Sequence, residues 1–305
     1  MIHGEAGRWA RYIIGTLLAA VLLYIAMRGV AFSDAWHIMS DLRWSYLYYA
    51  FGLTLVSPFA RAWRWKKLYD GEAPGFWVLV RAVSVGQTLN FVVPFRSGEV
   101  ARVFMVGGRK LDTAGTIAFE KLLDVAFFAA LCLVLPFVWV VPKWLEGPRQ
   151  SMIIMAAVYI AAIAAFVLVI PRVSRFPRFV RVPRLRNIPL IVAVTLFLGI
   201  SGIMVNDLVL RSLHIEAPFM AAVVLLVILQ VGIAIPSTPG KLGVYQYLAV
   251  LGLSLFSVGH APALAFGLVM HLLVFLPTAA IAALFLVFGR EKSSAASQQV
   301  SNERQ

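Results

Sequence analysis

Two carboxylates inside one apolar stretch have a spacing that suggests chemistry. Glu120 and Asp124 are four positions apart, so a helix places both on one face. Such a pair repels unless one acid is protonated or a cation lies between them. Arg81, Arg96 and Arg102 are the candidate cations, and Arg81 interrupts a run that is otherwise apolar. The pattern fits either a structural ion network or a polar cavity for an ionic headgroup, and both hypotheses stay open.

Two proline–glycine breaks form a second set of candidate residues. The first break contains Arg96, Ser97, Gly98 and Glu99, and the second contains Pro239, Gly240 and Lys241, with Gln246 shortly after it. A helix that starts after such a break has unpaired backbone N–H groups that favour an anion. A basic residue beside these amides is typical of a phosphate site. Two ordinary helix breaks would give the same residues, so that alternative stays open.

Cysteine and histidine do not form a pattern that binds a metal. Cys132 is the single cysteine, and the five histidines are too scattered for ligand spacing. The chain also has no nucleotide-binding motif. We therefore expect no catalytic residues, no metal and no cofactor.

The composition places these residues in a membrane protein. Of the 305 residues, 61% are apolar and 13% are charged, whereas soluble domains are about 45–50% apolar. This excludes a soluble enzyme, a disordered chain and a fibrous protein. The net charge of +13 indicates basic loops that face an anionic cytoplasmic leaflet, with no nucleic-acid partner.

Hydropathy predicts an all-α, polytopic integral membrane protein. A spanning helix needs about 20 apolar residues for a hydrocarbon core of about 30 Å. Six runs qualify: 11–30, 44–60, 115–141, 151–170, 188–210 and 261–288. Three further runs, 76–94, 217–235 and 242–258, are shorter or interrupted. We predict six full spans plus two broken or re-entrant helical hairpins, or eight spans if the second hairpin crosses.

The chain is expected to hold one transmembrane domain over 1–290 and a disordered cytoplasmic tail over 291–305. Most Lys and Arg residues fall on one side of this topology, which predicts that both termini are cytoplasmic. Pro94 and Gly98 recur 142 positions later as Pro236 and Gly240. This predicts an inverted repeat, 44–141 and 186–288, typical of transporters that join two discontinuous helices near the midplane.

Three motifs resemble a known family, the flippase-like membrane domain named after the transmembrane region of lysylphosphatidylglycerol synthetases. This domain occurs in multiple peptide resistance factors and in stand-alone membrane proteins. The motifs are Pro94-Phe-Arg-Ser-Gly-Glu-Val-Ala-Arg102, Glu120-Lys-Leu-Leu-Asp124 and Pro236-Ser-Thr-Pro-Gly-Lys-Leu-Gly-Val-Tyr-Gln246. The likeness covers roughly residues 10–290. Lys121 replaces the family's usual Arg, and Lys241 and Gln246 replace a frequent Gly and Glu, which indicates a sub-branch with its own ligand.

The resemblance implies a translocase (flippase) of an anionic or phosphate-containing polar lipid in the bacterial cytoplasmic membrane. Its partners would be membrane lipids and the anionic inner leaflet, and a homo-oligomer is compatible with it. The longest polar stretches, 171–187 and 291–305, are short, so we expect no aminoacyl-transferase activity. The alternatives are an intramembrane lipid-modifying enzyme that uses Glu120 and Asp124, or an accessory membrane subunit of a lipid or envelope pathway.

Overall fold

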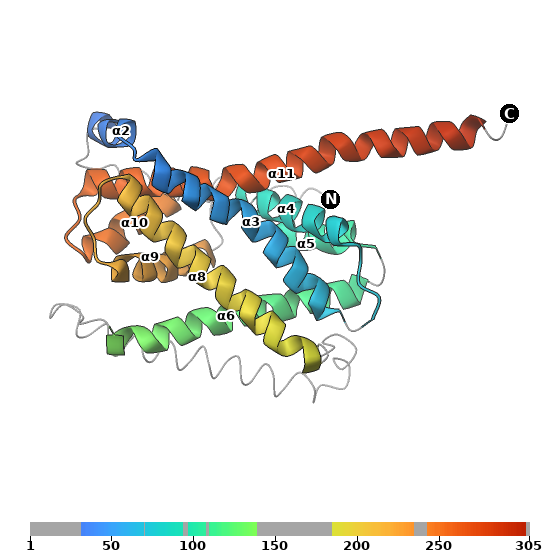
Figure 1. Cartoon of the computed structure of the whole chain (residues 1–305), viewed down its shortest axis with the longest axis horizontal. Helices are drawn as coiled ribbons and strands as arrows, with labels where there is room; N and C mark the ends of the chain where they lie inside the picture. The colour runs from blue at the N-terminus through green and yellow to red at the C-terminus, as the bar shows by residue number, and fades with distance from the viewer. Residues whose placement is uncertain are drawn as a thin grey trace, which may run out of the picture.

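The computed structural model describes residues 32–69, 71–93, 97–107, 110–138, 185–234 and 243–302, and the regular structure in these ranges is helical (Figure 1). The α-helices are α2 (Phe32–Ser40), α3 (Trp44–Leu68), α4 (Phe76–Val92), α5 (Ser97–Met105), α6 (Lys110–Val138), α8 (Ile188–Ser212), α9 (Phe219–Ala234), α10 (Val244–Ser254) and α11 (His260–Asn302). A 3-10 turn over Leu185–Asn187 precedes α8. The predicted all-helical class is confirmed. The predicted spans 11–30 and 151–170 lie outside the described residues.

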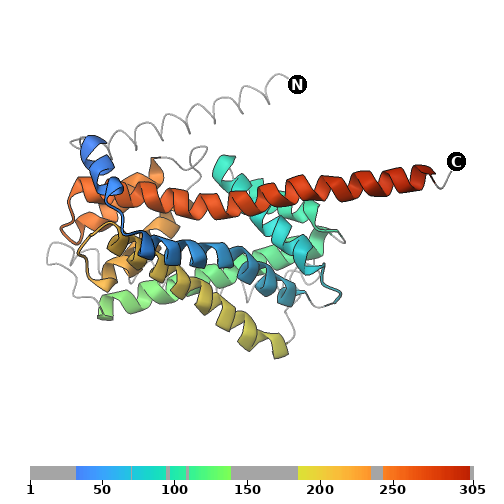
Figure 2. The same cartoon turned by 45° about the horizontal axis from the view of Figure 1, so that its top comes forward.

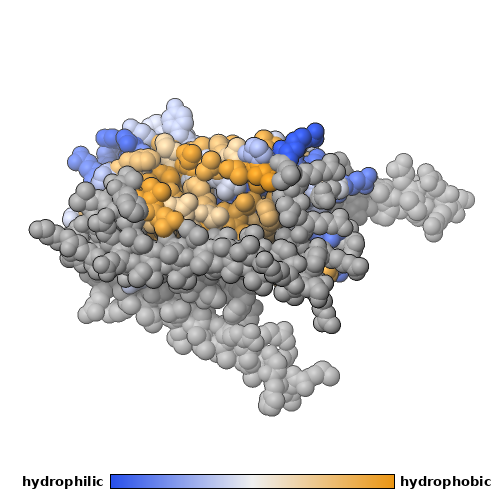
Figure 3. Space-filling view, turned by 90° about the horizontal axis from the view of Figure 1, so that it is seen from below, coloured by the Kyte–Doolittle hydropathy of each residue, from blue (hydrophilic) through white to orange (hydrophobic). Residues whose placement is uncertain are grey.

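Two of the described helices are long and apolar enough to cross a bilayer. They are α8, with a mean hydropathy of 2.5, and the part of α11 over His260–Val287, with 2.3. On α8, Leu196, Ile200 and Met204 form a row of exposed apolar side chains. Figure 3 shows apolar residues across the middle of one face and hydrophilic residues toward both ends. Contact with lipid explains this surface, because a large exposed apolar patch is unfavourable in water.

Helices α3 and α8 lie side by side and run in opposite directions. Near the start of α3, the Arg43 amide donates a hydrogen bond of 2.9 Å to the carbonyl of Ser212, at the end of α8. At the other end, the Asn187 side chain donates to the carbonyl of Lys67 at 3.2 Å. Helix α3 therefore continues eight residues past the predicted boundary at residue 60, because its basic residues favour helix and Arg64, Trp65 and Leu68 of this extension are buried.

Helices α4 and α5 form a hairpin whose arms touch backbone to backbone. The Gly98 amide donates to Oδ1 of Asn90 at 2.8 Å, and a Cβ at Gly98 would collide with the carbonyl of Gly86. Helices α9 and α10 form a second hairpin, in which Gly252 packs against Leu225. In each hairpin a glycine permits the close approach of the two arms.

Helix α6 crosses α8 where the Phe127 ring lies on Gly199. This crossing brings the carboxylates of α6 beside α3 and α8. Apolar side chains form one core around Trp65, Leu79 and Val83, and a larger one among α8, α9, α10 and α11. The polar residues of α6 face the first of these cores.

Helix α11 passes the start of α4 and projects beyond the bundle (Figures 1 and 2). The centres of the Trp77 and Phe285 rings are 6.4 Å apart, and this contact holds α11 against the start of α4. The backbone is helical through Asn302, and the disordered tail over 291–305 stays a prediction. The segment 291–302 has no proline or glycine, and extending an existing helix avoids the cost of nucleating a new one.

Candidate functional site

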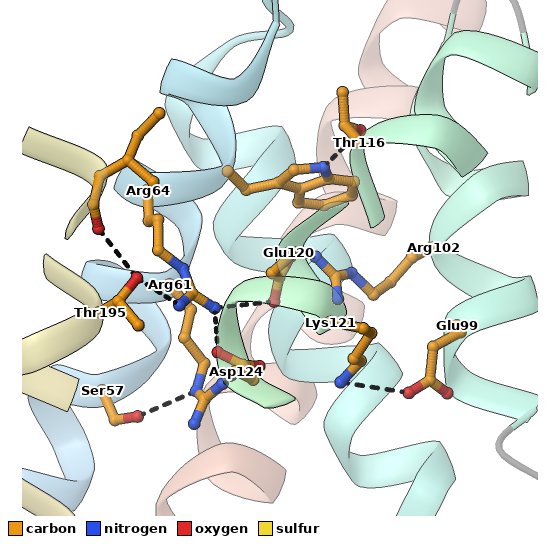
Figure 4. Close-up of polar contacts among 12 residues, drawn as sticks. Ser57, Arg61, Arg64, Glu99, Arg102, Thr116, Glu120, Lys121, Asp124 and Thr195 are labelled. Carbon is orange, nitrogen blue, oxygen red and sulfur yellow. Dashed lines mark hydrogen bonds and ion pairs between the residues drawn. The ribbon is translucent and has the colours of Figure 1, made fainter. Parts of the chain in front are cut away.

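Glu120 and Asp124 share a face of α6, and three arginines from two other helices point toward them (Figure 4). Arg61 and Arg64 come from the last turns of α3, and Arg102 comes from α5. The side chains of Arg64, Arg102 and Glu120 are 0%, 6% and 2% exposed. We call these five residues the ion cluster. Its inner part is sealed from solvent.

Arg102 is held in place from two directions. Its Nη2 atom lies 2.6 Å from Oε2 of Glu120, and its guanidinium lies 4.0 Å from the centre of the Trp65 ring. This is a cation–π contact at a desolvated site. Nε1 of Trp65 donates to Oγ1 of Thr116 at 2.9 Å, which fixes the orientation of the ring. The α4–α5 hairpin is thereby joined to α3 and α6.

Arg64 connects three helices. Its Nη2 atom lies 2.8 Å from Oδ1 of Asp124 and 3.6 Å from Oε1 of Glu120. Its Nη1 atom donates to Oγ1 of Thr195 on α8 at 3.0 Å. Both carboxylates therefore share one cation, which removes the repulsion expected between two neighbouring acids.

The outer edge of the cluster is accessible. Nη1 of Arg61 lies 3.8 Å from Oδ2 of Asp124, and these side chains are 24% and 22% exposed. Nε of Arg61 donates to Oγ of Ser57 at 3.3 Å. Nearby, Nζ of Lys121 lies 3.4 Å from Oε1 of Glu99, so this pair is neutral by itself. An incoming group would meet this edge first.

Charge and hydrogen bonding both leave capacity for an anion. Three guanidinium groups face two carboxylates, so the ion cluster carries a net charge of +1. Within the described part of the chain, Nε of Arg64 and Nε of Arg102 are buried without a hydrogen-bond partner. A buried donor without a partner destabilises the fold by about 1–3 kcal/mol. These two Nε atoms lie in the sealed inner part, so it is the net charge that suits an anionic ligand at the accessible edge.

Three predicted site residues, Arg102, Glu120 and Asp124, meet in the cluster. Glu99 lies beside the cluster, where it forms an ion pair with Lys121. Ser97 and Gly98 lie at the start of α5, where Oγ of Ser97 is buried and has no partner among the described residues. Arg96, Pro239, Gly240 and Lys241 lie outside the described residues.

Two predicted site residues point elsewhere. Arg81 is exposed, because α4 turns Val80, Ala82 and Val83 inward. The interpretation of Arg81 as a cation for the two acids is therefore wrong in this structure. Gln246 is buried, and its Oε1 accepts a hydrogen bond from the Gly243 amide at 2.8 Å. It caps the start of its own helix, α10.

Arg61 and Arg64 were not predicted as site residues. The predicted span ended at residue 60, which placed both in a cytoplasmic loop. Their spacing could have indicated the site. Residues three or four positions apart share a helix face, so Arg61 and Arg64 on one helix could pair with Glu120 and Asp124 on another. Within the described ranges, no group of three or more His, Cys, Asp and Glu side chains is placed to hold a metal ion.

The fold and the ion cluster define a helical membrane protein with a charged site inside its bundle. The family described as the lysylphosphatidylglycerol synthase TM region matches residues 12–282. Because the match covers most of the chain, the protein belongs to this family, and the resemblance seen in the sequence is confirmed. No curated protein matches the chain.

Proposed function

We propose that this protein is a translocase that moves a lipid with an anionic or phosphate-containing headgroup across the cytoplasmic membrane. The observation that carries the proposal is the ion cluster, with its net charge of +1 and its accessible edge at Arg61 and Asp124. Charged residues within membrane segments cost at least about 2.5–3.5 kcal/mol each, and they commonly mark substrate pathways. The headgroup would bind at this edge while the lipid tails stay in the bilayer.

The helix bounds support an inverted repeat. Moved by 142 residues, the bounds of α3 become 186–210, close to those of α8 at 188–212. The bounds of α4 become 218–234, close to those of α9 at 219–234. Helices α3 and α8 run in opposite directions, as inversion requires. In transporters such repeats place a binding site between two broken segments.

The hairpins have the dimensions of re-entrant segments. Helices α9 and α10 have 16 and 11 residues, which give lengths of about 24 Å and about 16 Å. Both are shorter than a hydrocarbon core of about 30 Å. The Phe91 ring of α4 and the Tyr245 ring of α10 lie 5.8 Å and 5.5 Å from the ring of His271 on α11. The two hairpins thus approach each other at one residue of α11.

Charge at the two ends of the bundle supports a cytoplasmic location for the termini. The end where α3 finishes carries Arg61, Arg64, Lys66 and Lys67, whereas the opposite end carries four acids, Asp34, Asp41, Asp207 and Glu216, beside only two described arginines, Arg43 and Arg211. Basic residues remain on the cytoplasmic side of membrane proteins. We therefore assign the end of α3 to the cytoplasm of a bacterial inner membrane.

The contacts of the two acids favour transport over an intramembrane enzyme. Glu120 and Asp124 both lie in ion pairs with arginines, which suits charge balance. A general acid or base needs a free position toward its substrate. The carboxylates therefore serve the site by setting its charge.

Reconstitution into vesicles tests the proposal. A fluorescent phospholipid with an anionic headgroup should cross faster in vesicles that contain the protein than in protein-free vesicles. Arg61→Gln should slow this movement, because it removes the accessible cation. Lys67→Gln is the matched control, since it removes one positive charge from α3 outside the cluster. Equal rates with and without the protein would refute transport, and covalently altered lipid in the extract would favour the enzyme.

A further inference from the structure

We infer that the headgroup bound at the ion cluster carries a single negative charge, as a phosphodiester does, and that charge matching selects the lipid. The inference rests on the proposed function and narrows its substrate class. It predicts which of three headgroup types, monoanionic, dianionic or zwitterionic, the protein accepts. It also predicts how single substitutions change that choice.

The charge count is the first step. Arg61, Arg64 and Arg102 face Glu120 and Asp124, which leaves one positive charge. The adjacent pair of Lys121 and Glu99 adds no net charge. Charge interactions are several times stronger inside a bundle than in water, so an uncompensated charge there is costly.

One negative charge neutralises the occupied cluster. A phosphodiester brings one negative charge at neutral pH. A phosphomonoester brings about 1.5–2 and would leave an excess of negative charge. A headgroup with no net charge would leave the cluster at +1. The monoanion is therefore the best match.

The contact lengths identify the arginine that receives the phosphate. Arg102 and Arg64 hold their carboxylates at 2.6 Å and 2.8 Å and are buried. Arg61 lies 3.8 Å from Asp124 and is 24% exposed. Turning Arg61 toward a ligand therefore gives up the weakest of these pairs. Arg61 is the binding residue, and Asp124 sets the net charge beside it.

Substitutions that shift the cluster charge should shift the lipid preference. Arg61→Gln makes the cluster neutral and should favour a zwitterionic headgroup. Asp124→Asn raises the charge to +2 and should favour a phosphomonoester. Arg61→Lys keeps the charge and should keep the wild-type order. Lys67→Gln removes a positive charge outside the cluster and should also keep that order.

The experiment compares three fluorescent lipids with identical tails in vesicles that contain the purified protein or a variant. The probes are phosphatidylglycerol, phosphatidylcholine and phosphatidic acid. The wild type should move the first at least about tenfold faster than the other two, equivalent to about 1.4 kcal/mol. Binding of each lipid to the detergent-solubilised protein, followed by its thermal stabilisation, gives a second measurement that does not require transport.

The outcomes separate the two proposals. Charge matching is supported if the wild type moves phosphatidylglycerol fastest, Arg61→Gln prefers phosphatidylcholine and Asp124→Asn prefers phosphatidic acid. Movement of lipid with the same preference in wild type and both variants overturns charge matching and leaves translocation intact. Equal rates for all lipids with and without protein overturn translocation itself, and with it the inference. Melting curves of each variant show that it is folded, and a variant that fails to fold is replaced by Arg61→Ala or Asp124→Ala.

Discussion

Arg61 and Arg64 stand three residues apart on α3, yet their surroundings differ in kind. Arg64 is fully buried and bridges Asp124, Glu120 and Thr195. Arg61 lies at the accessible edge with one long ion pair. The first arrangement stabilises the fold, and the second leaves a cation free to change partner.

Replacing the buried arginine should therefore destabilise the protein much more than replacing its neighbour. Arg64→Met leaves two acids with less compensation and should lower the free energy of unfolding by about 3–5 kcal/mol. Arg61→Met should lower it by about 1 kcal/mol or less, because the pair is partly exposed. Denaturant unfolding in detergent, followed by tryptophan fluorescence, measures both. Equal losses would contradict the division of the cluster into an inner part and an outer edge.

The sequence predicted part of this cluster. Glu120, Asp124 and Arg102 were identified because charges in or beside apolar runs stand out. Arg64 was missed because its neighbours are also basic, which resembles a loop until tertiary pairing is known. Arg81 was misplaced because hydropathy says that a charge lies within a helix but not which face it occupies.

At the scale of elements, the α4–α5 hairpin depends on one glycine contact. Gly98 approaches the carbonyl of Gly86, and its amide bonds to Asn90. Helix α5 has only nine residues, so it relies on this contact and on Arg102 for its position. A hairpin held in this way positions the cluster's third arginine.

Gly98→Ala should separate the two arms and lower stability by about 1–3 kcal/mol, the usual result of overpacking. Gly52→Ala is the matched control, because nothing lies within 4 Å of a Cβ at that position of α3. In that helix the same change should raise stability by about 0.5–1 kcal/mol. Thermal unfolding of both variants checks the opposite signs. A Gly98→Ala protein as stable as the wild type would show that the arms are free to separate.

Element positions followed from hydropathy better than element ends did. The predicted starts at 44, 76 and 188 agree with α3, α4 and α8. The ends differ because helix termination depends on capping and tertiary contact. Helix α3 continues to Leu68, and its last turns, which contain the basic residues, pack against other helices. Helix α6 begins at Lys110, before its apolar run. Length alone could not tell a re-entrant hairpin from two short spans.

At the scale of the whole molecule, hydrophilic residues lie toward both ends of an apolar belt (Figure 3), and the last turns of α3 place Arg61, Arg64, Lys66 and Lys67 at one of these ends. This distribution predicts which thiols a membrane-impermeant reagent reaches from each side. Cys132 is the single cysteine, so Cys132→Ala gives a background without thiols. In it, Lys67→Cys should be labelled from the cytoplasmic side and Asp41→Cys from the opposite side. Labelling of both from the same side would contradict the proposed orientation.

Thr238→Cys extends the same experiment to the second hairpin. If 217–258 is re-entrant, the reagent should not reach position 238 from the cytoplasm. Two full spans would place it on the cytoplasmic face, where it would be labelled as fast as Lys67→Cys. The labelling rate relative to that variant distinguishes the two topologies.

The two halves that the proposed inverted repeat would relate carry different residues at the ion cluster's positions. The ion cluster uses Arg61, Arg64, Glu120 and Asp124 of the first half. The positions 142 residues further on hold Ile203, Asn206, Pro262 and Phe266. For the proposed translocase, the described residues therefore place a charged binding site near the cytoplasmic leaflet. Its half-saturating lipid content should then differ between the leaflets, while the net direction of flow is still fixed by the lipid's own gradient.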